Sequence, residues 1–387
     1  MRLAIIRFSG PYISPDYYNV QEIGLARHLA KYGISTDLFF VQKPNNQQQI
    51  IYPDPANKSI RLFYLPAYLR LPSNHCLIRG LKDSISHNRY DIVQIQDSYS
   101  VGSVQAGVML RDIRCPVVLH QGIYHNPIRV KRQVQFLFEK SAGRLLRKTV
   151  AACIAKTRDA KEYLEYYGYK NIVVLPMGLD ADRFKDVAIP SQPGHLFEGN
   201  KTGLSLLYVG TIRPHRKIDF LVRVCKELGS RGLATDFVLV GEGSSMPEYV
   251  NLVKKLGVER NVHFVGRVPN DQLSPFYSNA NFFLLASESE ILGMVYMESL
   301  LHGLPVITNS NAGSRSVISC GSDGFILDTL SVKEWCDRIQ SVWNDRGTYE
   351  RMRMNARENS RRFHWSAVAK QYADFYRDVI ENHGTPK

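Results

Sequence analysis

The chain has 387 residues, of which 44% are hydrophobic and 22% are charged. This length predicts two domains, and the composition excludes a disordered or fibrous class. Because no apolar run reaches the roughly 18 to 20 residues that span a bilayer, and the N-terminal residues enter a first predicted strand directly, we expect a cytoplasmic protein. The formal charge of +13 favours acidic partners, whether nucleic acid, an anionic membrane or phosphorylated small molecules.

The first half of the chain alternates short apolar runs with amphipathic stretches, which is the pattern of a parallel α/β sheet. We expect residues 1–185 to form one doubly wound domain. Its predicted strands are 3–8, 36–40, 92–96, 117–120, 151–155 and 173–175. Its predicted helices are 20–31, 76–86, 101–111, 130–148 and 157–167.

One stretch of this first half is strongly basic. Between Arg129 and Lys161 the chain carries ten lysines and arginines but only two acids, Glu139 and Asp159. Apolar residues recur within it at roughly helical spacing, so the segment from Arg129 to Lys148 could lie on an anionic membrane surface. The alternative is a packed helix with a solvated basic face.

A linker rich in proline, glycine and polar residues is predicted at 186–203, and a cleft between two domains should open there. The second domain, residues 204–360, repeats the α/β pattern. A basic and aromatic helical stretch at 361–387 is long enough to cross back to the first domain. The predicted strands of the second domain are 205–209, 236–240, 262–265, 282–285 and 305–307.

Glycines stand where several predicted strands end, notably Gly10, Gly210 and Gly241. Ligands of open α/β sheets bind outside the carboxyl ends of the strands, so these glycines are candidates for phosphate-binding loops. None of them belongs to a Gly-x-Gly-x-x-Gly or Walker pattern, so no motif supports a dehydrogenase or a P-loop enzyme.

Two carboxylates, Glu290 and Glu298, lie eight residues apart in otherwise apolar surroundings. A helix that begins near Gly293 would place Glu298 on or beside its apolar stripe, where an unpaired carboxylate costs several kcal/mol. Sugar hydroxyls would satisfy these acids, and the free N–H groups at Gly293 and Met294 would attract phosphate. The alternative is an ordinary boundary glutamate that pairs with a nearby arginine.

In chain order these segments resemble the retaining, nucleotide-sugar-dependent glycosyltransferases of family 4, also called glycosyl transferases group 1. Their GT-B fold has two Rossmann-like, doubly wound parallel-sheet domains that face each other across a cleft. Glu290 and Glu298 match the family's Glu-x7-Glu signature. Other matching segments are Pro176–Asp180, Gly266–Pro269, Gly303–Ile307 and Asn311–Arg315.

The resemblance implies roles for individual residues. Glu298 would bind ribose hydroxyls, Glu290 the donor sugar, and backbone near Arg267 would border the base. Thr211 stands where the family has an arginine for the diphosphate, so Arg213 could replace that arginine, and Arg216 or Lys217 could fill the family's lysine position. The loop after Gly10 departs from the family's paired glycines.

His120 ends a predicted strand of the first domain and resembles a histidine at the family's cleft. It could hydrogen-bond the sugar or the acceptor, although a histidine in this position is often only a packed hydrogen-bonding residue. No metal-ligand cluster is visible in the sequence, so we expect neither a metal nor a cofactor; the nucleotide-sugar would be a substrate.

The resulting hypothesis is a retaining, metal-independent hexosyltransferase that serves cell-surface glycan biosynthesis with a lipid-linked or polysaccharide acceptor, peripheral on the inner membrane face. A nucleotide-sugar epimerase on the same fold is the first alternative. A nucleic-acid-binding protein is a weaker one, because the chain has no zinc-finger or aromatic RNA-binding motif, and we expect no nucleic-acid partner. The donor sugar, its base, the acceptor, the linkage and the oligomeric state stay open.

Overall fold

The computed structural model forms two compact units. Unit 1 is Met1–Gly178 with Trp365–Lys387, and unit 2 is Leu179–His364. The residues that the structure describes are 1–8, 20–41, 49–51, 58–71, 75–113, 115–122, 129–184 and 203–383.

The unit boundaries differ by a few residues from the expected positions at 185 and 360. Leu179 pairs with His364 in a short parallel bridge, and the Leu179 N–H donates to the Phe363 carbonyl at 2.6 Å. The chain passes between the units at residues 178–179 and 364–365, and these contacts pair the unit 2 ends of both passages. Most of the expected linker lies outside the described residues.

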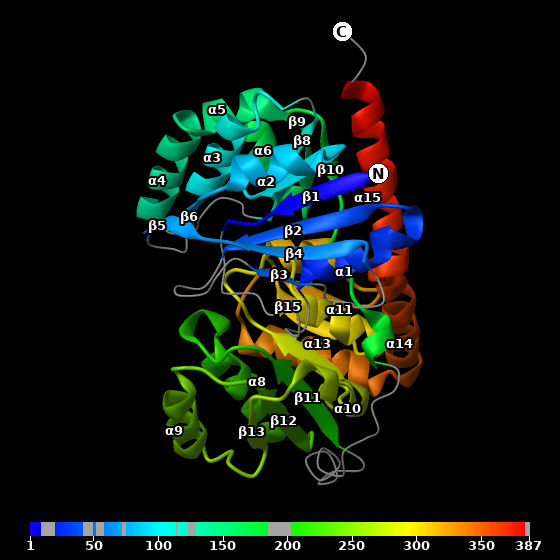
Figure 1. Cartoon of the computed structure of the whole chain (residues 1–387). Helices are drawn as coiled ribbons and strands as arrows, with labels where there is room; N and C mark the ends of the chain where they lie inside the picture. The colour runs from blue at the N-terminus through cyan, green and yellow to red at the C-terminus, as the bar shows by residue number, and fades with distance from the viewer. Residues whose placement is uncertain are drawn as a thin grey trace. The chain divides into compact units, whose positions relative to one another are not determined.

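Unit 1 is built on an eight-stranded sheet in the order β10-β9-β8-β7-β1-β2-β4-β3, parallel except for the β3–β4 pair (Figure 1). The strands are β1 Arg2–Ile6, β2 Ser35–Val41, β3 Gln49–Ile51, β4 Ile60–Leu65, β7 Ile92–Gln96, β8 Val117–Gln121, β9 Val150–Ala155 and β10 Ile172–Val174. The helices are α1 Gln21–Leu29, α2 Leu81–Asn88, α3 Val101–Met109, α4 Arg129–Lys140, α5 Gly143–Thr149 and α6 Arg158–Tyr166.

Two predicted helices of unit 1 were wrong in extent. The one at 76–86 begins as strand β6, His75–Ile78, which pairs with β5, Ala67–Leu71; α2 starts only after Gly80, whose left-handed φ of 73° ends the preceding segment. The one at 130–148 is split into α4 and α5: at the break the backbone bonds shorten to an i to i+3 pattern, with the Arg144 N–H donating to the Ser141 carbonyl and the Leu145 N–H to the Ala142 carbonyl, both at 3.1 Å.

Unit 2 holds a six-stranded, fully parallel sheet in the order β13-β12-β11-β14-β15-β16. The strand order reverses between β11 and β14, so the loops that follow these two neighbours lie beside each other. The strands are β11 Leu204–Val209, β12 Thr235–Val240, β13 Val262–Gly266, β14 Phe282–Leu285, β15 Val306–Asn309 and β16 Gly324–Leu327. The helices are α8 Ile218–Ser230, α9 Met246–Leu256, α10 Ser274–Asn279, α11 Met294–Leu301, α12 Ala312–Val317, α13 Val332–Asn344 and α14 Arg346–Ser360.

The last helix, α15 Trp365–His383, belongs to unit 1 although it follows unit 2 in the chain, and it packs on α1 (Figure 1). Its Tyr376 hydroxyl donates to Gln94 at 2.6 Å inside the sheet layer. The α/β fold class with two Rossmann-like sheets is therefore confirmed, while the cleft between them stays a prediction. No helix among the described residues has the length and apolar character needed to cross a bilayer.

Candidate active site

The candidate site in unit 2 lies where the loops after β11 and β14 meet. The loop after β11 is pressed against the loop after β12, since the Ile212 N–H donates to the Glu242 carbonyl at 3.0 Å. A Cβ at Gly241 would lie 1.9 Å from the Gly210 carbonyl oxygen, and one at Gly243 would lie 2.1 Å from that of Ile212. Only glycine allows this close backbone approach.

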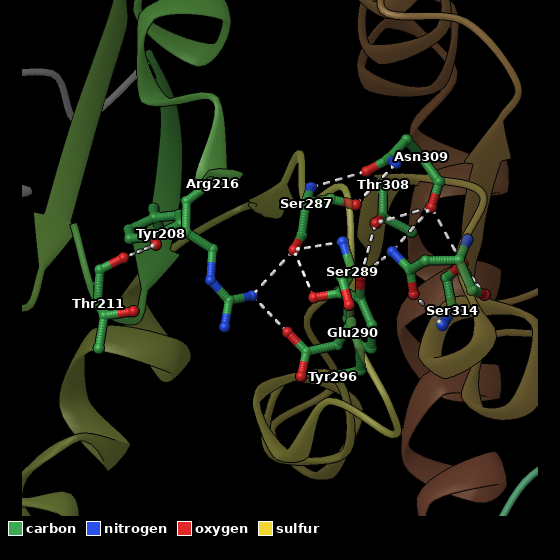
Figure 2. Close-up of polar contacts among 11 residues, drawn as sticks. Tyr208, Thr211, Arg216, Ser287, Ser289, Glu290, Tyr296, Thr308, Asn309 and Ser314 are labelled. Carbon is green, nitrogen blue, oxygen red and sulfur yellow. Dashed lines mark hydrogen bonds and ion pairs between the residues drawn. The ribbon is translucent and has the colours of Figure 1, made fainter. Parts of the chain in front are cut away.

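Arg216 is the central cation of the site (Figure 2). Its Nη1 donates to the Ser287 hydroxyl at 3.2 Å and forms an ion pair with Glu290, so it joins the two loops. Burial lowers the pKa of Arg216, but the Glu290 carboxylate outweighs this effect and leaves the pKa above its ordinary value. The Nε–H of Arg216 is buried and has no hydrogen-bond partner within the described part of the chain.

Lys217 lies beside Arg216 but pairs with a different acid. It adopts a left-handed φ of 46° at the start of α8, and its ammonium lies 2.6 Å from Glu288. The hydrogen bond to Glu288 raises the pKa of Lys217. The Glu288 N–H also donates to the His215 carbonyl at 3.1 Å, which adds a second tie between the loops. Arg213, the third candidate cation, is exposed.

Glu290 packs closely against two glycines. A Cβ at Gly293 would lie 2.9 Å from the Glu290 Cγ, and one at Gly313 would lie 3.1 Å from it. The Gly313 N–H also donates to the Glu290 carbonyl at 3.0 Å. Gly293, with φ 72°, caps α11, so Met294 begins that helix as expected and its N-terminus lies directly after the acid.

Glu298 lies on α11 and is only 2% exposed. It accepts a hydrogen bond from the Tyr277 hydroxyl at 2.8 Å, and the Tyr277 ring stacks on His302. The alternative interpretation, a glutamate that pairs with a nearby arginine, therefore holds for Glu290, which pairs with Arg216. Glu298 instead accepts the hydrogen bond of a tyrosine hydroxyl.

The remaining predicted donor contacts are more peripheral. Arg267 has a side chain 71% exposed and lies 3.8 Å from Glu242. Gly10 lies outside the described residues. Ser287 was not predicted from the sequence. Its hydroxyl accepts a hydrogen bond from Arg216 and donates one to the Ser289 carbonyl at 3.0 Å. The signal was available: two serines follow the end of a buried strand, Phe282–Leu285.

His120 belongs to unit 1, where it is 1% exposed. Its Nδ1 lies 3.2 Å from the Gln96 amide oxygen and its Nε2 lies 3.0 Å from the Tyr372 hydroxyl of α15. Burial, with the charge of Lys156, holds the pKa of His120 well below its ordinary value, so the ring is neutral. The structure therefore shows it as a packed hydrogen-bonding residue, and a contact with sugar stays a prediction.

A second polar cluster, also missed, lies at the carboxyl ends of strands in unit 1. Arg7 lies 3.2 Å from both carboxylate oxygens of Glu22, and the Gly122 N–H donates to Asp97 at 2.8 Å. Lys156 follows β9, is only partly exposed, and makes no hydrogen bond or ion pair through its ammonium within the described ranges. The described residues contain no group of three metal-ligating side chains.

Two Rossmann-like α/β units, each built on a sheet of mainly parallel strands, are the architecture of the GT-B glycosyltransferases. Two family models agree: residues 197–359 match "Glycosyl transferases group 1" and residues 23–183 match "Glycosyltransferase Family 4". The chain belongs to this family of glycosyltransferases.

Three similar proteins are distant in sequence but match nearly the whole chain. A D-inositol 3-phosphate glycosyltransferase of Corynebacterium aurimucosum is 24% identical over 94% of this chain and 91% of its own length. Sucrose-phosphate synthase from Thermosynechococcus elongatus has a similar structure, with TM-score 0.75 and 19% identity over 98% of this chain and 99% of that one. Anabaena HepE in complex with UDP gives TM-score 0.74 and 17% identity over 98% of this chain and 100% of that one. These likenesses in structure establish the fold.

Proposed function

We propose that this glycosyltransferase is a retaining, metal-independent hexosyltransferase that takes its sugar from a nucleotide-sugar donor. One observation carries the proposal: Arg216 reaches across the strand reversal to Glu290 and still has a buried, unpaired Nε–H. A diphosphate that becomes a leaving group gains negative charge, and a preorganised guanidinium beside a helix N-terminus stabilises that charge. The crystallised UDP complex of HepE is consistent with a nucleotide ligand in this fold.

The two acids have separate tasks in this proposal. Glu290, fixed between Gly293 and Gly313, contacts the donor sugar, and Glu298 accepts hydrogen bonds from the ribose hydroxyls in place of that from Tyr277. Retention follows from attack on the face that the diphosphate leaves, so no enzymic nucleophile is needed. Arg267 and the glycine-ended loops border the base and the phosphates.

The acceptor is proposed to bind unit 1, where the cluster of Arg7, Asp97 and Lys156 offers charged donors and acceptors for hydroxyl groups. A lipid-linked or polysaccharide acceptor agrees with the exposed basic segment Arg129 to Lys148. We accordingly place the protein on the inner face of the membrane, in the biosynthesis of a cell-surface glycan. A phosphorylated polyol is the substrate named for the relative from Corynebacterium.

The test is equilibrium binding and turnover with a panel of UDP- and GDP-sugars. Glu298→Gln should weaken donor binding about tenfold or more, because a carboxylate that accepts hydrogen bonds from two hydroxyls is replaced by an amide. Tyr277→Phe is the matched control: it removes the internal hydrogen bond, leaves the carboxylate, and should bind donor within about twofold of the wild type.

Three outcomes would contradict the proposal. The first is that Glu298→Gln does not weaken donor binding. The second is the absence of both sugar transfer and donor hydrolysis with every nucleotide-sugar. The third is conversion of the donor to an epimer without an acceptor. The last result would identify an isomerase on the same fold.

A further inference from the structure

An exposed apolar and basic surface covers one side of unit 1. Val130, Val134 and Leu137 follow one another on one face of α4 and are 68%, 51% and 65% exposed. Leu145 of α5, 50% exposed, adds a fourth apolar side chain. We call these four residues, with their exposed basic neighbours, the α4 face; the neighbours are Arg129, Lys131, Arg132, Lys140, Arg144 and Lys148.

The one acid of this segment is removed from the surface. Glu139 is 0% exposed and accepts hydrogen bonds from the Ser98 hydroxyl and, at 2.8 Å, from Tyr163. Arg147 lies 3.6 Å from the same carboxylate, so it also turns inward. The outward charges of α4 and α5 are therefore all positive.

A groove of about 500 Å³ opens beside the α4 face, between α4 and α6. The Lys140 ammonium lies at its edge, 5.6 Å from the ring centre of Phe136 and 6.0 Å from that of Tyr166. An ammonium beside two aromatic rings can bind a charged group of a ligand whose apolar part contacts the rings. The groove is lined by Arg132, Gln133, Phe136, Leu137, Tyr166 and Tyr167.

We propose that the α4 face docks on an anionic lipid bilayer, with lipid phosphates at Lys140 and its basic neighbours and an acyl chain against Phe136 and Leu137. Exposed apolar side chains at helical spacing, flanked by cations, are the combination that binds this interface, because burial of the apolar groups adds to the attraction of the charges. Nucleic acid would use the cations but would leave Val130, Val134 and Leu137 in water. The inference rests on the proposed function only for its choice of a membrane-bound acceptor.

The experiment is co-sedimentation of the full chain, without donor, with phosphatidylcholine vesicles that contain or lack phosphatidylglycerol. Binding should require the anionic lipid, and Leu137→Asp and Lys140→Glu should each weaken it about tenfold. Leu330→Asp and Lys254→Glu, at a leucine 42% exposed and an exposed lysine of unit 2, should bind within about twofold of the wild type.

Equal binding to both kinds of vesicle, or an equal loss in the two control variants, would overturn the proposal. So would binding to duplex DNA that is as tight as to vesicles and is weakened by Lys140→Glu but not by Leu137→Asp. Because no sugar transfer is measured, failure of docking is distinguishable from failure of the proposed activity, which is read by donor turnover in solution.

Discussion

Arg216 and Glu290 form the contact on which the proposed donor site depends. Each has a side chain less than one fifth exposed, 19% and 17%, so their attraction is less screened than that of surface pairs. Lys217 and Glu288 form a parallel pair, but their side chains are 34% and 56% exposed. The difference in burial predicts a difference in function between two adjacent cations.

We expect Arg216→Met to lower kcat by about a hundredfold or more, because it removes a preorganised charge from the leaving diphosphate. Lys217→Met, the matched substitution, should lower kcat less than about tenfold. Steady-state kinetics with the preferred donor measure both. Arg216→Lys should recover part of the rate. If Lys217→Met lost more activity than Arg216→Met, Lys217 rather than Arg216 would be the cation that stabilises the diphosphate.

Asp323 is a second residue whose surroundings alter its chemistry. It is 0% exposed and accepts hydrogen bonds from the Ser319 N–H at 2.9 Å and from the Asn359 amide. Burial is the main influence and raises the pKa of Asp323 to about 6. The folded state therefore holds a proton on this carboxyl more tightly than the unfolded chain does.

The sign of the pH dependence follows. The stabilisation that this proton brings is complete below the ordinary aspartate pKa, about 3.9, and is lost as pH rises through about 6. The difference of about two between these pKa values corresponds to about 3 kcal/mol in the free energy of unfolding. We expect Asp323→Asn to gain stability relative to the wild type between pH 4 and pH 7, measured by urea unfolding. The exposed Asp328→Asn is the control. A constant difference between wild type and Asp323→Asn would contradict the prediction.

At the scale of elements, α1 shows how packing overrides helix propensity. Gly24 lies inside α1, where alanine would ordinarily stabilise a helix by about 1 kcal/mol. A Cβ at Gly24 would, however, lie 2.6 Å from the Trp365 indole nitrogen. Gly229 in α8 has open space around the same position, with no atom within 4 Å.

The two glycines should therefore respond in opposite directions. We expect Gly24→Ala to destabilise the protein by about 1–3 kcal/mol through overpacking, and Gly229→Ala to stabilise it by up to about 1 kcal/mol. Scanning calorimetry of both variants measures this. If Gly24→Ala raised the melting temperature as Gly229→Ala does, Trp365 would not be packed against α1 as described.

At the scale of the whole molecule, the chain leaves unit 1 after Gly178 and returns to it at Trp365. The returning helix α15 brings Trp365, Tyr372 and Tyr376, all at most 2% exposed, onto unit 1. Its tyrosine hydroxyls reach His120 on β8 and Gln94 on β7. The stability of the N-terminal sheet thus depends on residues at the far end of the sequence.

A chain that ends at His364 should accordingly lose hydrogen-exchange protection in α1, β7 and β8, while β11 to β16 keep theirs. Mass spectrometry of peptides from the two units measures the difference. The double substitution Tyr372→Phe/Tyr376→Phe, which keeps the helix, should give a smaller loss of the same pattern. Uniform loss across both units would show that α15 does not belong to unit 1 alone.

Much of the fold was predictable because parallel strands buried on both faces are continuous apolar runs. Ile92–Gln96 and Phe282–Leu285 match their predicted bounds, and most other predicted strands differ by one or two residues. Strand β4, Ile60–Leu65, was missed, and the start of the helix predicted at 76–86 was wrong. In the second case the residues of β6 also fit a helix, and only their pairing with β5 decides between the two.

The sequence by itself determined the α/β fold class, because the periodicity of buried residues is a local property, and the resemblance of several segments, among them the acid pair Glu290 and Glu298, to a known pattern indicated the family. Tertiary structure decided which cation meets which acid: Arg216 and Lys217 are neighbours in the chain, and only the strand reversal between β11 and β14 brings Arg216 to Glu290. It also decided that Glu139 turns inward and that His120 is covered by Tyr372, since both outcomes depend on contacts between segments far apart in sequence.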